Sequence, residues 1–88
     1  MKPTNNAVIE EFCQKLCETI KKKNADYDNA FAKAYDKFGG ETGALHIYEK
    51  TERIIALTKG EAQTNESLDD ALMDCAGYCL LYLDQRHG

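Results

Sequence analysis

The chain has 88 residues, of which 43% are hydrophobic and 30% are charged, and its formal net charge is −4. An acidic chain lacks the basic surface that non-specific nucleic-acid binding requires. No apolar run reaches the ~18 residues of a membrane span and no apolar core follows the N-terminus, so we expect a cytoplasmic protein. A domain of this size buries a modest core, so we also expect a homodimer or a higher oligomer.

The first predicted helix begins at a polar cap within residues 4–6 and runs to about Lys23. Residues 1–6 are polar and are expected to fray. The apolar face of the helix consists of Ile9, Phe12, Cys13, Leu16 and Ile20. A basic run at a helix end is commonly solvated, but Lys23 lies within about 60° of Ile20 and can point inward.

A second, short helix is predicted between a cap on Asp26 or Asp28 and its last residue, Phe38. The Gly-Gly pair after Phe38 stops this helix, and Gly43 is interpreted as a further break.

The third helix is predicted from about Ala44 to Lys59. Its apolar arc consists of Leu45, Ile47, Tyr48, Ile54 and Ile55. Glu49 and Glu52 lie beside this arc, and Arg53 follows Glu49 by one turn, which is a spacing that permits an ion pair.

The longest periodic segment runs from Glu66 to Leu83 and is predicted to be a central helix. Its apolar face is formed by Leu68, Leu72, Cys75, Ala76, Cys79 and Leu83. Glu66, Asp70 and Asp74 repeat every four residues on the opposite side. Carboxylates on a mostly buried helix require a cation, a metal or a hydrogen-bond network as a partner. Ser67 fits a cap at the start of this helix, and residues 84–88 form a polar tail that is expected to fray.

Four helical segments joined by short loops, one of them at residues 61–65, predict an all-α, four-helix bundle-like single domain over residues 1–88. Short loops favour antiparallel neighbours, with the first, third and fourth helices forming the core. The cysteines occur as two pairs at i,i+4 spacing, Cys13 with Cys17 and Cys75 with Cys79. We expect thiols that act as small hydrophobic residues, with a zinc site or disulfides as alternatives.

Three blocks, in order, resemble the phage and bacterial nucleotide modification associated domain, a small helical family. They are Lys23-Asn24-Ala25-Asp26-Tyr27-Asp28; then Glu49-Lys50-Thr51-Glu52-Arg53; and finally Glu66-Ser67, Asp70, Asp74 and Ala76-Gly77-Tyr78. Asp28 stands where the family has glycine, and a left-handed backbone there would suit aspartate less well. A looser similarity is to the MazG-like nucleoside triphosphate pyrophosphohydrolases, whose paired acidic motifs have the spacing of Glu49-x-x-Glu52 and Glu66-x-x-Asp69.

The resemblance implies a nucleotide site that uses Mg²⁺, an ion that prefers carboxylate oxygens and keeps several waters. The candidate metal ligands are Glu49, Glu52, Glu66, Asp70 and Asp74. Glu52, Asp70 and Asp74 are also the candidate catalytic residues, which would position or activate a water. The candidate ligand-binding residues are Lys23 and Arg53 for phosphate oxygens, and Asp26 and Tyr27 for hydrogen bonds at the mouth.

The alternative for these charges is a structural network of ion pairs, in which Glu66 and Asp70 serve the helix start. That explanation does not reach Asp74, which lies two turns into the helix. Tyr48, Tyr78 and Tyr82 could stack on a base, or pack in the core or an interface.

The function expected from this reasoning is a phage-type nucleotide-binding protein in the host-cell cytoplasm, with Mg²⁺-dependent nucleotide pyrophosphohydrolysis as its enzymatic form. The alternative is a non-enzymatic phage inhibitor of a host defence system. Such an inhibitor would be an anti-CRISPR-like binder of a host defence protein or a sponge for a signalling nucleotide. The third hypothesis is a scaffold whose acidic residues are structural.

Overall fold

The structure, a computed structural model of the chain, describes residues 1–62 and 65–88. Within these residues it contains four helices and no strand: α1 (Asn6–Asp26), α2 (Ala30–Phe38), α3 (Glu41–Lys59) and α4 (Leu68–His87). The predicted all-α class is confirmed. The loop predicted at residues 61–65 includes positions 63–64, which lie outside the described residues.

The start of α1 follows the expected capping chemistry, whereas its end lies beyond the predicted one. The Asn5 side chain accepts hydrogen bonds from the backbone N–H groups of Ala7 (3.0 Å) and Val8 (3.3 Å). The helix continues past Lys23 to Asp26, and the N-cap position of α2 is Asn29, so the predicted cap of α2 at Asp26 or Asp28 is wrong. Asn29, which precedes α2, has φ 57°.

Gly43 was predicted to separate α2 from α3, and this is wrong because α3 already begins at Glu41. The ring of Tyr82 on α4 lies against the backbone at this point. A Cβ atom at Gly43 would come within 2.7 Å of Tyr82 Cγ. The glycine is therefore a place of close helix packing. The α2–α3 connection is also held by Thr42, whose buried hydroxyl donates a hydrogen bond to the Ala34 carbonyl (3.2 Å).

The start of α4 agrees with the prediction, because Ser67 accepts a hydrogen bond from the Asp70 backbone N–H at 3.0 Å. The predicted fraying tail at 84–88 is wrong for residues 84–87, which continue the helix to His87. Leu81 and Tyr82 are half-buried against the rest of the fold, and this packing carries the helix through its last turns.

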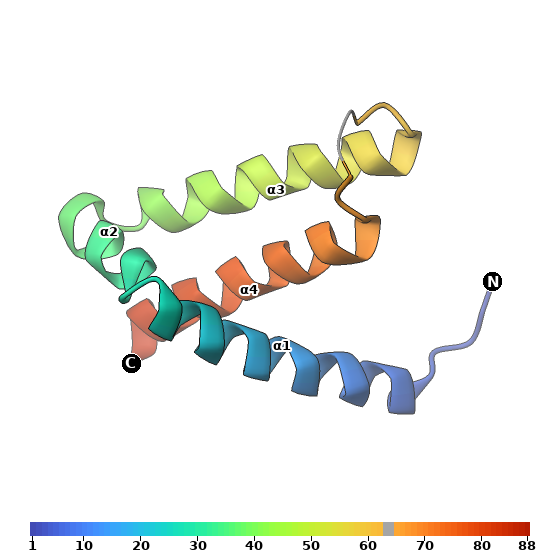
Figure 1. Cartoon of the computed structure of the whole chain (residues 1–88), viewed down its shortest axis with the longest axis horizontal. Helices are drawn as coiled ribbons and strands as arrows, with labels where there is room; N and C mark the ends of the chain where they lie inside the picture. The colour runs from blue at the N-terminus through green and yellow to red at the C-terminus, as the bar shows by residue number, and fades with distance from the viewer. Residues whose placement is uncertain (63–64) are drawn as a thin grey trace.

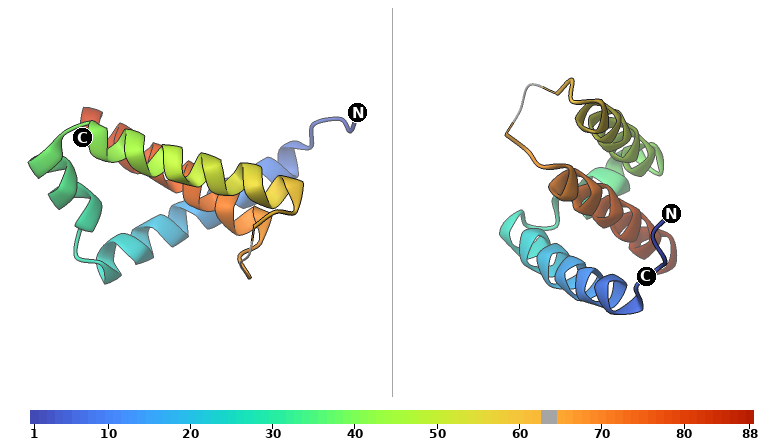
Figure 2. Two further views of the ribbon diagram at one scale, coloured as in Figure 1. Left: turned by 90° about the horizontal axis from the view of Figure 1, so that it is seen from above. Right: turned by 90° about the vertical axis from the view of Figure 1, so that its right-hand side faces the viewer.

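The helices α3 and α4 form an antiparallel hairpin with the most extensive packing in the molecule, and α2 closes the end of the hairpin opposite its loop (Figure 1). The helix α1 crosses α4 near Gly77, where Leu16 and Ile20 come closest to the glycine. Towards its N-terminus α1 diverges from the hairpin and projects away from it, as two further views show (Figure 2).

The apolar interior is small. Among the described residues, only two hydrophobic side chains are buried, those of Phe31 (7% exposed) and Ala71 (0% exposed). Phe31 contacts the rings of Tyr35, His46 and Tyr78 at centroid distances of 6.1–6.2 Å. Phe31 therefore joins α2, α3 and α4 around one aromatic group.

The apolar face predicted for α4 does not supply this interior. Leu68, Leu72 and Leu83 are 36%, 46% and 50% exposed. The neighbouring helices instead pack against the other side of α4, where Ala71 and Gly77 are buried and Asp74 is half-buried. No described helix, over residues 1–62 and 65–88, is long and apolar enough to cross a membrane.

Candidate functional site

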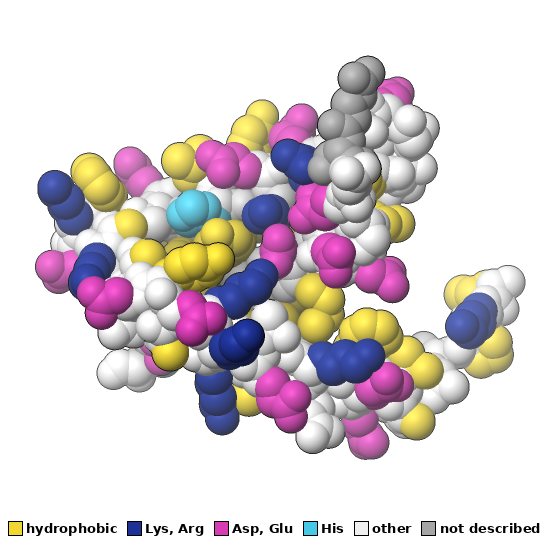
Figure 3. Space-filling model, in the orientation of Figure 1, with side chains coloured by type: hydrophobic (Ala, Val, Ile, Leu, Met, Phe, Trp, Pro, Cys, Tyr) yellow, Lys and Arg dark blue, Asp and Glu magenta, His cyan; other side chains and the backbone are white. Residues whose placement is uncertain are grey.

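A charged groove lies between the projecting part of α1 and the α3–α4 hairpin (Figure 3). Its volume is about 780 Å³. Basic and acidic side chains from three helices line it together with Phe12, Thr19 and Met73. The basic residues are Lys15, Lys23, Lys50 and Arg53, and the acidic residues are Glu18, Glu66, Asp69, Asp70 and Asp74.

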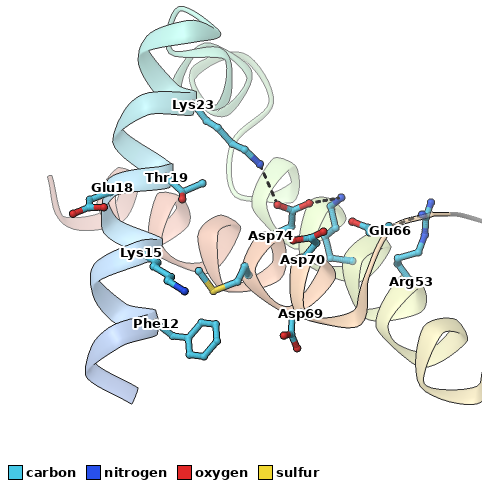
Figure 4. A pocket seen from close by; sticks show the side chains of 12 residues that line it. Phe12, Lys15, Glu18, Thr19, Lys23, Arg53, Glu66, Asp69, Asp70 and Asp74 are labelled. Carbon is cyan, nitrogen blue, oxygen red and sulfur yellow. Dashed lines mark hydrogen bonds and ion pairs between the residues drawn. The ribbon is translucent and has the colours of Figure 1, made fainter. Parts of the chain in front are cut away.

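Asp74 lies between two lysines that come from different helices. Its Oδ1 is 3.3 Å from Nζ of Lys23 on α1, and its Oδ2 is 3.4 Å from Nζ of Lys50 on α3 (Figure 4). The side chains of Asp74 and Lys50 are 29% and 27% exposed, whereas that of Lys23 is 54% exposed. Because water reaches all three groups, the two ion pairs contribute little to stability, about 1 kcal/mol or less each.

A third ion pair closes the end of the groove near the start of α4. Arg53 Nη1 on α3 is 3.1 Å from Glu66 Oε1, which precedes α4. Asp70 lies one turn along α4 from Glu66 on the same side, between this pair and Asp74 (Figure 4). Acidic groups on one side of α4 thus face basic groups of α1 and α3 across the groove.

The predicted site residues are brought together only in part. Lys23, Arg53, Glu66, Asp70 and Asp74 all line the charged groove. Tyr27 lies outside it, in a neighbouring cavity, and Asp26 lines neither space.

Glu49 and Glu52 do not converge with the acids of α4. Both are exposed, and neither lines the charged groove. Helical geometry gives the reason, because α3 faces α4 through Lys50 and Arg53. Glu49 precedes Lys50 by one residue and is turned by about 100° from it, and Glu52 is turned by about 160°.

An aromatic cavity of about 500 Å³ adjoins the groove and reaches into the space between α1, α2 and α4. The rings of His46 and Tyr78 are stacked there, with centroids 4.4 Å apart and an interplanar angle of 1°. Phe31 is packed against both rings. The remaining lining is mostly aliphatic, from Leu16, Ile20, Ala30, Ala34, Met73 and Leu81, with Asn24 and Tyr27 as polar groups.

The groove and the cavity share four lining residues: Thr19, Lys23, Met73 and Asp74. The Lys23–Asp74 ion pair therefore stands where a space lined by charges meets one lined by rings. A ligand with an anionic part and a flat apolar part could occupy both spaces at once, with its junction beside this pair.

The sequence reasoning missed Lys50, Lys15 and the His46–Tyr78 stack. Lys50 lies within the quoted block Glu49-Lys50-Thr51-Glu52-Arg53, and its spacing of three residues from Arg53 is the signal that both bases share a face. His46 carries no comparable signal, since its partner Tyr78 is distant in sequence.

The predicted Mg²⁺ site needs oxygen ligands that lie close together. Across residues 1–62 and 65–88, no three histidine, cysteine, aspartate or glutamate side chains are grouped in a way that could hold a metal ion. Asp74 and Glu66 are engaged by basic groups. Asp70 and Asp74 carry the hard oxygen atoms that Mg²⁺ prefers, but Asp74 is paired with two lysines, so a Mg²⁺ site here stays a prediction.

All four cysteines are free thiols. Partial burial, followed by the charge and hydrogen bonding of Cys75, raises the pKa of Cys79 above its ordinary value. The protonated thiol of Cys79 is therefore favoured at neutral pH, which does not suit a metal ligand or a nucleophile. Cys13, Cys17 and Cys79 are exposed and only Cys75 is half-buried, so the role of the four cysteines as small apolar groups stays a prediction.

In comparisons with known proteins, no protein-family model matches the chain, and no curated protein or solved structure does so either.

Proposed function

We propose that this protein binds a nucleotide, with the base in the aromatic cavity and the phosphates in the charged groove. The observation that carries the proposal is the position of Asp74 between Lys23 and Lys50, at the junction of the two spaces. A nucleotide combines a flat ring system with an anionic chain. Stacking on aromatic side chains and contact with lysine and arginine are the interactions by which proteins hold these two parts.

The bases of the groove supply the phosphate contacts in this proposal. The groove is lined on one side by Lys15 and Lys23 of α1 and on another by Lys50 and Arg53 of α3. When a phosphate enters, Lys23 and Lys50 move partly away from Asp74 and contact phosphate oxygens instead. Because these ion pairs are weak in water-accessible surroundings, the exchange costs little.

The enzymatic form of the proposal is Mg²⁺-dependent pyrophosphohydrolysis, in which water and a nucleoside triphosphate yield a nucleoside monophosphate and pyrophosphate. Mg²⁺ bound with the triphosphate would neutralise phosphate charge, and Asp70 and Asp74 are the carboxylates placed to hold it. The expected resemblance to the nucleotide modification associated domain points to the same residues of α4.

A second candidate is nucleotide binding without turnover, as in a sponge for a signalling nucleotide. The pairing of Glu66 and Asp74 with basic side chains favours it, because a metal ion would have to compete with lysine and arginine for these carboxylate oxygens. Glu49 and Glu52, which would complete a second carboxylate pair, are turned away from the groove.

Calorimetric titration with nucleoside triphosphates, with and without Mg²⁺, tests the binding, and chromatography of the products tests turnover. Lys50→Met is expected to weaken binding by about tenfold or more, since an interaction with a charged group is worth about 1.5–3 kcal/mol. Lys33→Met is the matched control, because Lys33 pairs with Asp28 outside both spaces.

Binding that releases pyrophosphate, and loses the release in Asp70→Asn, would support the enzyme. Binding with unchanged nucleotide would support the sponge. Equal loss in Lys50→Met and Lys33→Met, or the absence of binding by the wild type, would contradict the nucleotide proposal.

A further inference from the structure

The apolar stripe of α4 is largely exposed in the single chain. It is formed by Leu68, Leu72, Cys75, Ala76, Cys79 and Leu83, of which Cys75 and Ala76 are half-buried. Its three leucines are 36–50% exposed and Cys79 is exposed. The stripe extends along most of α4 without a charged residue among its members. Its small side chains, Cys75, Ala76 and Cys79, lie between leucines at the two ends, which permits close approach of another helix at the middle of the stripe.

The projecting half of α1 carries a second uncovered apolar set. Val8, Ile9 and Phe12 are 42%, 49% and 39% exposed. Figure 3 shows hydrophobic side chains at the surface of the part of α1 nearest the N-terminus. Farther along the same face, Leu16 and Ile20 are half-buried at the crossing with α4. One apolar face of α1 is thus covered at one end only.

The total surface of the chain is larger than a folded monomer of its mass should have. The accessible area is 6832 Å² for 9.9 kDa. Compact monomers of this mass expose about 5,200 Å², so the excess is about 1,600 Å². The radius of gyration is 14.2 Å, compared with about 12 Å for a compact domain of this length. Both values show that the chain is less compact than a typical monomer of this size.

We propose that a second copy of the chain covers the apolar stripe of α4 and the projecting half of α1, and that the protein is a two-fold symmetric homodimer. Removal of about 1,600 Å² from each copy gives a total of about 3,200 Å². That total lies within the range of about 2,000–5,000 Å² for obligate dimers.

Two observations favour a second copy over other occupants. The described part of the chain contains no fully buried large side chain, so the partner must supply core packing from the moment of folding. Another copy is the one polypeptide that is always present at that moment. A net charge of −4 disfavours an anionic membrane surface, which attracts basic segments.

The dimer does not depend on a bound nucleotide, and it has a consequence for the charged groove. Phe12 belongs both to the projecting half of α1 and to the lining of the groove. The second copy would therefore lie beside the open side of the groove and reduce its contact with water. Electrostatic interactions inside the groove become stronger as water is excluded.

Light scattering coupled to gel filtration, together with sedimentation velocity, tests the proposal on the full chain. The expected mass is about 20 kDa, which is twice the 9.9 kDa of the chain. Leu72→Glu places two carboxylates in the interface and is expected to yield a monomer of half that mass, or an unfolded chain. Ile55→Glu is the matched control, because Ile55 is 43% exposed, much as Leu72 is at 46%, but lies on α3 outside the stripe.

The native cysteines give an independent readout that does not depend on a variant. Cys75 and Cys79 lie in the stripe, whereas Cys17 follows Leu16 by one residue and is turned by about 100° from it. Brief alkylation followed by mass spectrometry is expected to label Cys17 first. Cys75 and Cys79 should be labelled only after addition of urea.

A wild-type mass of 9.9 kDa with a cooperative unfolding transition would overturn the dimer. Rapid alkylation of Cys79 in a dimeric wild type would overturn the assignment of the stripe as its interface. So would a dimer that survives Leu72→Glu and is lost in Ile55→Glu. Failure of nucleotide binding would leave each of these outcomes unchanged.

Discussion

Two consecutive residues between α1 and α2 have left-handed backbone conformations. Asp28 has φ 52° and Asn29 has φ 57°. Aspartate and asparagine tolerate this region better than other residues with a Cβ atom, but glycine tolerates it best. Asn24 Nδ2 donates a hydrogen bond to Asn29 Oδ1 at 2.6 Å, which helps to hold the turn. From the sequence, aspartate at position 28 was expected to suit a left-handed backbone less well than glycine, and Asp28 nevertheless adopts this conformation.

At the residue scale, Asp28→Gly should raise the free energy of unfolding by roughly 0.5 kcal/mol, because strain in the left-handed region is relieved. The lost ion pair with Lys33 has little effect, since the Lys33 and Asp28 side chains are 66% and 85% exposed. Urea unfolding followed by circular dichroism measures the change. The control Asp28→Ala should lower the stability by about 1 kcal/mol, and equal values for the two variants would contradict a left-handed turn.

At the scale of elements, the contact between α3 and α4 depends on glycines as well as on apolar side chains. Gly40 and Gly43 both face the ring of Tyr82, and a Cβ atom at Gly40 would lie 2.7 Å from the Tyr82 hydroxyl oxygen. Ion pairs join the same two helices on the side of the groove. Lys50 of α3 pairs with Asp74 of α4, and Arg53 of α3 pairs with Glu66, which precedes α4. The packing that brings Tyr82 onto the glycines therefore also sets which face of α3 meets the acids of α4.

Gly43→Ala should lower the free energy of unfolding by up to about 2 kcal/mol. Overpacking costs about 1–3 kcal/mol, and the better helix propensity of alanine offsets about 1 kcal/mol of this. Chemical denaturation of the variant measures the loss. In a Tyr82→Ala background the same change should be neutral or stabilising, and a double-mutant cycle without coupling would contradict the close contact.

At the scale of the whole molecule, the exposed apolar surface predicts that stability depends on protein concentration, because a second copy would cover this surface. Unfolding of a dimer of two 88-residue chains absorbs heat in proportion to the combined length. The native state also gains from mass action as the protein concentration rises.

We therefore expect the thermal midpoint to rise by about 4 °C for each tenfold increase in protein concentration. Scanning calorimetry or circular dichroism over two orders of magnitude in concentration measures the slope. Ile55→Glu should keep the slope. A midpoint that does not change with concentration in the wild type would show that the chain folds as a monomer.

The sequence by itself determined the four helices, because apolar periodicity, Asn5, Ser67 and Gly60 are local signals that act within one or two turns. It also determined that Glu66, Asp70 and Asp74 share one face, since residues four positions apart lie above one another on any helix. The bases that meet them were identified in part, as Lys23 and Arg53 but not Lys50.

The tertiary structure alone decided which face of each helix is covered. Periodicity shows which residues lie together, but whether that set is buried depends on where the other helices run. On α3 it turned Lys50 and Arg53 towards α4 and left Glu49 and Glu52 exposed. On α4 it packed the acidic side against the neighbouring helices and left the apolar stripe outside. Such choices rest on contacts between residues far apart in sequence, which a local pattern does not contain.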